Sequence, residues 1–160
     1  MTNELAALGE SVVRAYTRAG KTIATAESCT GGWIAKVITD IDGSSAVFGY
    51  GVVSYSNDAK HTLLSVPAPV IDARGAVSED VVGWMANGVR NVSGADVAVA
   101  VSGIAGPGGG TDDKPVGTVW FAWSGLGQLS TEKKVFDGGR DDVRSQTVRH
   151  ALEGLLARLS

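Results

Sequence analysis

Two side chains that can act as nucleophiles, Ser28 and Cys29, lie next to each other in the segment TAESCTGG, residues 25–32. A β-prone stretch, TIATAE, precedes them, and a helix-like stretch follows from Trp33. A turn from a strand into a helix places its first side chain at the end of a sheet, where free helix N–H groups can hold an anion or an oxyanion. The segment therefore predicts Ser28 as a candidate nucleophile, with a plain helix N-cap as the structural alternative.

A serine hydroxyl needs a base, and the chain offers few. It has two histidines, and His150 falls in the closing helix, so a Ser–His–Asp triad is not favoured, although His61 stays open. Lys60 is the better candidate, because burial can lower the pKa of an amine enough to make it a base. We expect Cys29 to be a small buried residue rather than a nucleophile.

Glycine-bearing loops follow three predicted strands, at residues 28–32, 43–45 and 102–110. The third, SGIAGPGGGTDDKPVG, lets the backbone approach a ligand closely and turn N–H groups toward an anion. It matches neither the P-loop pattern nor the dinucleotide fingerprint, so it is either a ligand loop or a turn-rich connection. Taken singly, Tyr55 is compatible with an ordinary strand aromatic, and Arg140 with either a solvated helix start or a phosphate clamp.

Composition limits the class of protein. The 160 residues favour one domain, 1–160, and a formal charge of −3 argues against a nucleic-acid partner. The single cysteine suits a reducing compartment, and no apolar run approaches the roughly 20 residues of a membrane helix. We expect a cytoplasmic protein without membrane association.

Alternating helix and strand patterns supply the elements that must position these residues. Apolar spacing predicts helices at 4–19, from 33 to about 43, at 57–64 with Asn57 as its cap, from 78, and at the C-terminal end. Pro67 and Pro69 are expected to break the pattern. Strands are expected at 22–27, 46–55, 95–103, 116–124 and 129–136, the last two as a hairpin, with Gly49 and Gly51 marking a bulge or a close approach. The fold class is α/β, a three-layer α/β/α sandwich with a mixed, partly antiparallel sheet.

Five segments, taken in order, resemble one known family. They are TAESCTGGWIAKVITDIDGSSAVF, GVVSYSNDAKHTLL, GAVSEDVV, VSGIAGPGGGTDDKPVGTVWFA and FDGGRDDVRSQTV. Together they resemble the CinA C-terminal domain family, the nicotinamide-nucleotide amidohydrolases, from about residue 5 to 158. Larger family members carry an additional N-terminal domain, and this chain is expected to be a stand-alone form.

The resemblance implies hydrolysis of the carboxamide of nicotinamide mononucleotide to nicotinate mononucleotide and ammonia, with polar site residues at Ser28, Ser45, Tyr55, Lys60, Ser102 and Arg140. We expect no cofactor, and no metal because no His/Cys/Asp cluster has metal-ligand spacing. The expected catalytic set is Ser28, Lys60 and Tyr55, with Ser45 as the alternative nucleophile. The expected substrate-binding set is Cys29, Thr30, Gly31, Ser102, Gly103, Gly106, Gly108 and Arg140. In the expected roles, Lys60 takes the proton of the attacking serine, and Lys60 or Tyr55 returns one to ammonia. Backbone N–H groups from Cys29 to Gly31 are expected to hold the oxyanion, and Arg140 with the 102–110 loop the ribose phosphate.

Family membership also implies a homo-oligomer, a dimer or larger, for which the apolar Trp33, Trp84 and Phe48 are candidate interface residues; a core role for each is the alternative. Two rival functions remain open from the sequence. One is a nucleotide-binding module without catalysis, built on the same glycine loops. The other is a metal-dependent nucleotide pyrophosphatase, although no His/Cys/Asp cluster has metal-ligand spacing.

Overall fold

A mixed five-stranded sheet organises the molecule. The structure, a computed structural model, describes residues 3–160. The strands lie in the order β2-β1-β3-β4-β5. β1 pairs in parallel with β2 and β3, whereas β4 is antiparallel to both β3 and β5. The bounds are β1 Ile23–Glu27, β2 Phe48–Val53, β3 Val97–Gly103, β4 Thr118–Gly125 and β5 Gln128–Val135. The predicted sheet, including its C-terminal hairpin, is confirmed.

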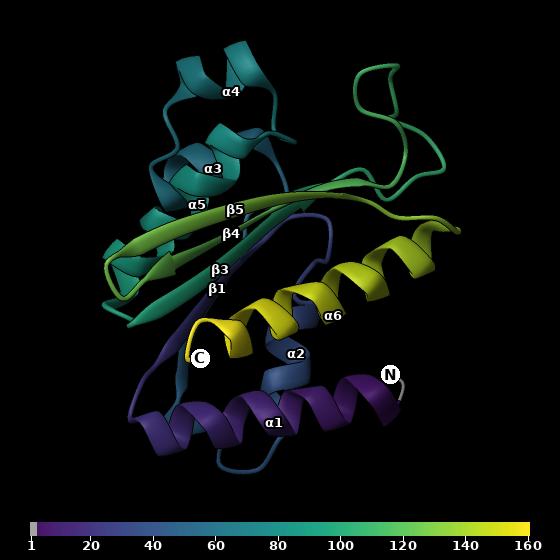
Figure 1. Ribbon diagram of the computed structural model, residues 1–160. Helices are drawn as coiled ribbons and strands as arrows, with labels where there is room; N and C mark the ends of the chain where they lie inside the picture. The colour runs from purple at the N-terminus through teal and green to yellow at the C-terminus, as the bar shows by residue number, and fades with distance from the viewer. Residues whose placement is uncertain (1–2) are drawn as a thin grey trace.

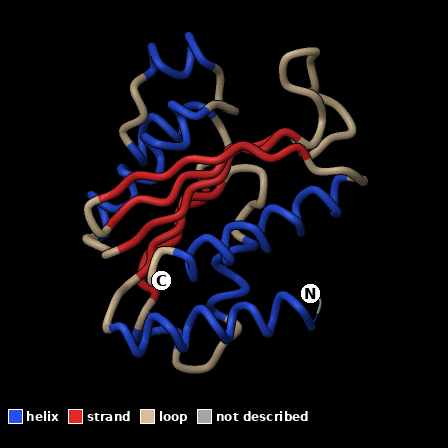
Figure 2. The backbone as a smooth tube through the Cα atoms, viewed as in Figure 1, coloured by secondary structure: helices blue, strands red, loops and turns tan. Residues whose placement is uncertain are grey.

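Helices cover both faces of this sheet (Figures 1 and 2). One layer contains α1 Asn3–Ala19, α2 Trp33–Thr39 and α6 Arg140–Ala157. The other contains α3 Asn57–Leu64, α4 Ala68–Arg74 and α5 Glu79–Ser93. A short 3₁₀ turn, η1 Ser44–Ala46, precedes β2. The predicted three-layer α/β/α sandwich is therefore confirmed.

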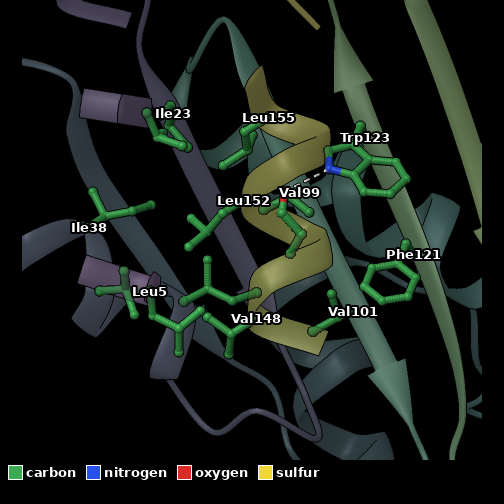
Figure 3. Close-up of a cluster of buried hydrophobic side chains, with 14 of the residues drawn as sticks. Leu5, Ile23, Ile38, Val99, Val101, Phe121, Trp123, Val148, Leu152 and Leu155 are labelled. Carbon is green, nitrogen blue, oxygen red and sulfur yellow. Dashed lines mark hydrogen bonds between the residues drawn. The ribbon is translucent and has the colours of Figure 1, made fainter. Parts of the chain in front are cut away.

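The central strand β3 shows why both faces can be covered. Its Val97, Val99 and Val101 belong to the hydrophobic core beneath α1, α2 and α6, while Ala98 and Ala100 belong to the core beneath α5. All five side chains are fully buried. Figure 3 shows Val99 and Val101 among leucines of α6 and the aromatic rings of β4. This run of apolar residues is typical of a strand buried on both sides.

The prediction that Pro67 and Pro69 break the helical pattern is confirmed for Pro67, which lies in the gap after α3 ends at Leu64, but it is wrong for Pro69, which lies inside α4. Pro67 is the N-cap and Pro69 lies in the first turn, where a helix N–H needs no intrahelical partner. The cap of α3 also differs from the prediction: Ser56, not Asn57, accepts the Ala59 N–H at 3.0 Å. Local side-chain chemistry, not helical periodicity, decides both boundaries.

Gly49 and Gly51 in β2 mark the predicted bulge and close approach. The pairing of β1 with β2 skips Gly49, because Ile23 pairs with Phe48 and the next residue pairs with Tyr50. A Cβ on Gly51 would lie 2.9 Å from the Phe48 ring, so this position is a close approach. The bulge and the close approach therefore both occur in this edge strand.

Candidate active site

A pocket of about 280 Å³ lies where β1 and β3 end, beside the start of α6. Nine of the predicted site residues line it: Ser28, Cys29, Tyr55, Lys60, Ser102, Gly103, Gly106, Gly108 and Arg140. The other lining residues are Ala76, Val77, Ile104, Ala105 and Gly109. A larger cavity of about 730 Å³ lies between α1 and residues 40–46. We place the candidate site in the smaller pocket, because the chemistry-bearing side chains converge there.

Parallel pairing explains this convergence. The carboxyl ends of β1, β2 and β3 lie at one edge of the sheet, and each is followed by a segment that reaches the pocket. Ser28 follows β1, Tyr55 and Lys60 follow β2, and Ser102 lies at the end of β3. Arg140 enters from the first turn of α6. A crevice at the carboxyl edge is the usual ligand position in α/β sheets.

Lys60 is the centre of the polar cluster. It is 1% exposed, and its Nζ donates to Ser28 Oγ at 2.9 Å. The same amine donates to the carbonyl oxygens of Ser54 at 2.8 Å and Tyr55 at 3.2 Å. All three contacts lie at hydrogen-bond distance. Two of the three acceptors are backbone carbonyl oxygens, which can only accept a hydrogen bond and never donate one. The amine is therefore held in one position, against the Ser28 hydroxyl.

Burial lowers the pKa of Lys60 to about 8, because desolvation disfavours the charged ammonium. Among residues 3–160, no carboxylate forms an ion pair with this amine to reverse the effect. A neutral amine has two N–H groups and one lone pair. When the Ser54 and Tyr55 carbonyls take the two N–H groups, the lone pair is left for the Ser28 O–H. The arrangement suits proton transfer from serine to lysine.

Ser28 is not a helix N-cap. α2 begins at Trp33 with Gly32 as its N-cap, so four residues of turn separate Ser28 from the helix. The Ser28 N–H donates to the Val101 carbonyl at 3.1 Å, and its carbonyl accepts the Gly31 N–H at 3.1 Å. The structural alternative for this serine therefore fails, and its hydroxyl faces Lys60 instead.

The same turn corrects part of the predicted oxyanion site. The Gly31 N–H is used by Ser28, so it is not a free donor. The N–H groups of Cys29 and Thr30 donate to no other residue within 3–160. The Cys29 N–H remains as a candidate donor to an oxyanion beside Ser28, because Cys29 lines the pocket whereas Thr30 is fully buried outside it.

Thr30 is not a substrate-binding side chain in this structure. It is fully buried, outside the pocket lining, and its hydroxyl donates to Glu27 Oε1 at 2.5 Å. Glu27 is 1% exposed and also accepts the N–H groups of Ile34 at 2.9 Å and Ala35 at 3.0 Å. Burial raises the pKa of Glu27, while these hydrogen bonds act in the opposite direction. Sequence reasoning missed Glu27, although a carboxylate inside the buried run IATAE must find partners.

Arg144 is the second residue that sequence reasoning missed. Its Nε donates to the Cys29 carbonyl at 3.0 Å and its Nη2 to the Thr30 carbonyl at 3.1 Å. Its guanidinium also lies over the Trp33 ring, 5.6 Å from the centroid. The turn after β1 is therefore held by Glu27 on one side and by α6 on the other. The spacing of RDDVR, one helical turn beyond Arg140, was the available signal.

Arg140 joins two sides of the pocket. Its Nη1 donates to the Gly106 carbonyl at 2.8 Å, and its Nη2 to the Tyr55 hydroxyl at 3.2 Å. Tyr55 is 61% exposed, so its phenol lies at the rim while its carbonyl holds Lys60. A guanidinium at this position presents a planar, charged group to an anionic ligand.

The β3 loop contributes a free hydroxyl and an open backbone. Ser102 is 1% exposed and lines the pocket, and its Oγ makes no hydrogen bond to a residue in the described part of the chain. A Cβ on Gly108 would meet nothing within 4 Å, whereas one on Gly106 would lie 2.4 Å from Val116. The loop therefore packs on one side and stays open toward the pocket on the other.

Cys29 and Ser45 do not supply a nucleophile to Lys60 in this chain. Burial raises the pKa of the Cys29 thiol to about 12, so it stays protonated at neutral pH. Ser45 is exposed and precedes β2, whose first residue pairs with Ile23 at the opposite end of β1 from Ser28. The five residues of β1 span roughly 16 Å. The expectation that Ser45 is an alternative nucleophile for Lys60 is corrected by this placement.

Of the three aromatic residues proposed for an interface, Trp33 and Phe48 pack against the hydrophobic core, while Trp84 is 46% exposed. Association of the chain with itself stays a prediction. Within residues 3–160, no helix is long and apolar enough to cross a membrane. No group of three or more His, Cys, Asp or Glu side chains gathers at metal-binding distance in that range.

Comparison with known proteins gives consistent matches along nearly the whole chain. The sequence profile of the CinA C-terminal domain matches residues 5–159. The nicotinamide-nucleotide amidohydrolase PncC of Escherichia coli K12 is 52% identical over 154 residues, which cover 96% of this chain and 93% of the relative. A CinA-like protein of Geobacter sulfurreducens is 52% identical over 93% of this chain but 36% of its own length. The solved structure of competence/damage inducible protein CihA from Agrobacterium tumefaciens superposes with a TM-score of 0.95 at 43% identity, covering 98% of this chain and 96% of that one.

Proposed function

Because this chain belongs to the CinA C-terminal domain family, we propose that it hydrolyses the carboxamide of nicotinamide mononucleotide to nicotinate mononucleotide and ammonia. The name of the Escherichia coli relative, a nicotinamide-nucleotide amidohydrolase, supports the reaction and the substrate. The observation that carries the mechanism is the 2.9 Å contact between Lys60 Nζ and Ser28 Oγ inside the pocket. A desolvated amine against a serine hydroxyl is a nucleophile with its base.

In the acylation step, neutral Lys60 removes the Ser28 proton as Oγ bonds to the carboxamide carbon. The oxyanion of the tetrahedral intermediate accepts a hydrogen bond from the Cys29 N–H, which donates to no other residue within 3–160. The C–N bond then breaks, and the Lys60 ammonium returns the proton to the leaving nitrogen. Ammonia leaves, and the ester on Ser28 remains. Lys60 is the group placed for both transfers, because its amine contacts Ser28 Oγ whereas the exposed Tyr55 phenol lies at the rim beside Arg140.

In the deacylation step, Lys60 is again neutral and takes a proton from water as the water oxygen bonds to the ester carbon. The second tetrahedral intermediate collapses with cleavage of the bond to Ser28 Oγ. The Lys60 ammonium reprotonates that oxygen, and the product forms as the carboxylic acid, which loses its proton to solvent and leaves as nicotinate. Nucleophile and base are both supplied by the chain, so this proposal needs no metal.

Charge in the pocket favours a phosphorylated substrate. The charged lining residues are Lys60 and Arg140, with no carboxylate in the lining. Since Lys60 is committed to the serine, Arg140 and the open backbone of the 102–110 loop are left for the phosphate. We propose that the Ser102 hydroxyl, which makes no hydrogen bond within residues 3–160, contacts the substrate between these two ends.

Arg140→Ala is expected to raise KM for nicotinamide mononucleotide by about 10- to 100-fold, the effect of losing a charged hydrogen bond to phosphate. The change in kcat should be smaller, because Arg140 makes no contact with Lys60 or Ser28. Steady-state kinetics check this, with Arg149→Ala as the matched control on an exposed part of α6. An unchanged KM would remove Arg140 from phosphate binding.

The pH dependence of kcat/KM should show a single base with a pKa of about 8, that of Lys60. Below this pH the amine is protonated and cannot accept the Ser28 proton, so kcat/KM should fall about tenfold per pH unit. Above it the amine is neutral and kcat/KM should level off. A profile that stays flat from pH 6 to pH 9 would contradict the assignment of Lys60 as the base.

Ammonia release from nicotinamide mononucleotide, with and without exhaustive chelation, tests the proposed reaction. We expect release to persist after chelation. Binding of the nucleotide without ammonia would favour the non-catalytic nucleotide-binding module. Loss of ammonia release on chelation, with recovery on adding metal, would contradict the metal-free mechanism, whereas release of a nucleoside monophosphate from a dinucleotide only in the presence of metal would favour the metal-dependent pyrophosphatase.

A further inference from the structure

We infer that Glu27 is a positioning residue, whose carboxylate fixes the turn from Ser28 to Gly32 against the start of α2 and so holds the Ser28 hydroxyl at Lys60. Glu27 does not line the pocket, and so it has no direct contact with the substrate. The inference deepens the proposed function, on which it rests for the reaction that Ser28 performs.

Glu27 caps the N-terminus of α2. Its N-cap, Gly32, has no side chain, and no side-chain cap is formed there. The N–H groups of Ile34 and Ala35, at the second and third helical positions, are those that an N-cap side chain ordinarily satisfies. Here Glu27 accepts both, at 2.9 Å and 3.0 Å, one with each carboxylate oxygen. The cap of α2 is therefore supplied by the residue directly before Ser28.

The contacts of Glu27 fix both ends of the turn from Ser28 to Gly32. The backbone of Glu27 is paired with Val53 on one side and Val101 on the other. Its side chain is bonded to α2 and, inside the turn, to the Thr30 hydroxyl at 2.5 Å. Ser28 lies between these anchored points, and its own N–H is bonded to β3. The position of the Ser28 hydroxyl therefore depends on the hydrogen bonds that Glu27 accepts.

A neutral side chain of the same shape cannot replace the Glu27 carboxylate. Glu27 is 1% exposed, and each carboxylate oxygen accepts at least one hydrogen bond. A glutamine has one acceptor oxygen, and its amide group would face an N–H donor. Glu27→Gln therefore leaves a buried helix N–H without an acceptor and loosens the turn.

The experiment compares Glu27→Gln with Glu10→Gln, which removes the same charge from an exposed position on α1. We expect kcat of Glu27→Gln to fall roughly 100-fold, since a displacement on the order of 1 Å at the reacting atoms has such effects. KM should stay within about threefold, and the pH inflection should stay where the wild type has it, because Glu27 does not contact Lys60. A structural role alone would lower the unfolding temperature and leave kcat unchanged in the folded range. That result, or loss of the pH inflection, would overturn the inference.

A second readout is independent of the substrate. A fluorophosphonate probe forms a bond from phosphorus to a reactive serine oxygen with loss of fluoride, and its rate at Ser28 should fall in Glu27→Gln in parallel with kcat. If the wild type releases no ammonia but this labelling still depends on Glu27, the proposed reaction fails and the positioning role stands. Labelling at Ser28 that is equally fast in both proteins overturns the positioning role, and so does its absence from the wild type.

The pair Thr30→Val and Thr30→Ser decides the matter if Glu27→Gln does not fold. Valine removes the hydroxyl that bonds to Glu27, and serine keeps it. We expect the valine variant to lose roughly tenfold in kcat and the serine variant to recover most of that loss. Equal kcat in the two variants would overturn the inference.

Discussion

Lys60→Met is expected to lower kcat for ammonia release by roughly a thousandfold or more, the largest effect of any change outside Ser28. The methionine fills a similar volume but cannot accept the Ser28 proton or return one to the leaving nitrogen. The fold should survive, because the buried ammonium is itself costly and its removal takes away a desolvation penalty. Steady-state kinetics with a thermal unfolding curve at the same pH measure both effects.

Lys36→Met is the matched control, because this lysine is exposed and pairs with Asp40 on the surface of α2. It removes the same charge from a helix that packs near the site, and kcat should stay within about twofold of the wild type. Near-normal kcat in Lys60→Met would remove the amine from the mechanism, whatever its position in the structure.

Ser28→Ala is expected to reduce kcat as strongly, because the attacking oxygen is lost. The double variant Ser28→Ala with Lys60→Met should be no slower than either single variant, since a nucleophile and its base act as one unit. Additive losses in the double variant would show that the two residues act in separate steps. Ser11→Ala makes the same change at an exposed position on α1, and it is the control for protein preparation and stability.

The proximity of Ser28 and Lys60 could be predicted from the sequence because parallel pairing is a strong constraint. Ser28 and Lys60 lie 32 residues apart, yet Ser28 directly follows β1 and Lys60 lies in α3, the helix that follows β2, and both strands end at the same edge. The β-prone runs around them are long enough to be recognised from composition alone. Once the order of strands is known, the convergence of the two segments follows.

The residues that sequence reasoning missed act through contacts whose partners cannot be identified from the local sequence. Glu27 appears as one residue of a strand, and its partners are backbone N–H groups seven and eight residues further on. Arg144 reaches carbonyls more than a hundred residues earlier in the chain. Such contacts depend on how α2 and α6 sit against the sheet, which periodicity does not determine.

The wrong predictions have a similar origin. Ser28 and Ser45 each lie in a glycine-bearing loop, residues 28–32 and 43–45, so their local sequences alone do not rank them. The register of β1 with β2 separates them, by placing Ser45 at the opposite end of the strand pair. Thr30 was expected to bind substrate because it lies in the turn, but a buried carboxylate beneath the turn takes its hydroxyl.

Identification of the covalent intermediate tests the central claim most directly. Nicotinamide mononucleotide is mixed with the enzyme, the reaction is stopped with acid within the first turnover, and the peptides are mapped by mass spectrometry. The account predicts that the acyl group of the substrate is found on the peptide that contains Ser28, and that it is absent from Ser28→Ala. An acyl group on Ser45, on Cys29 or on any other side chain would contradict it.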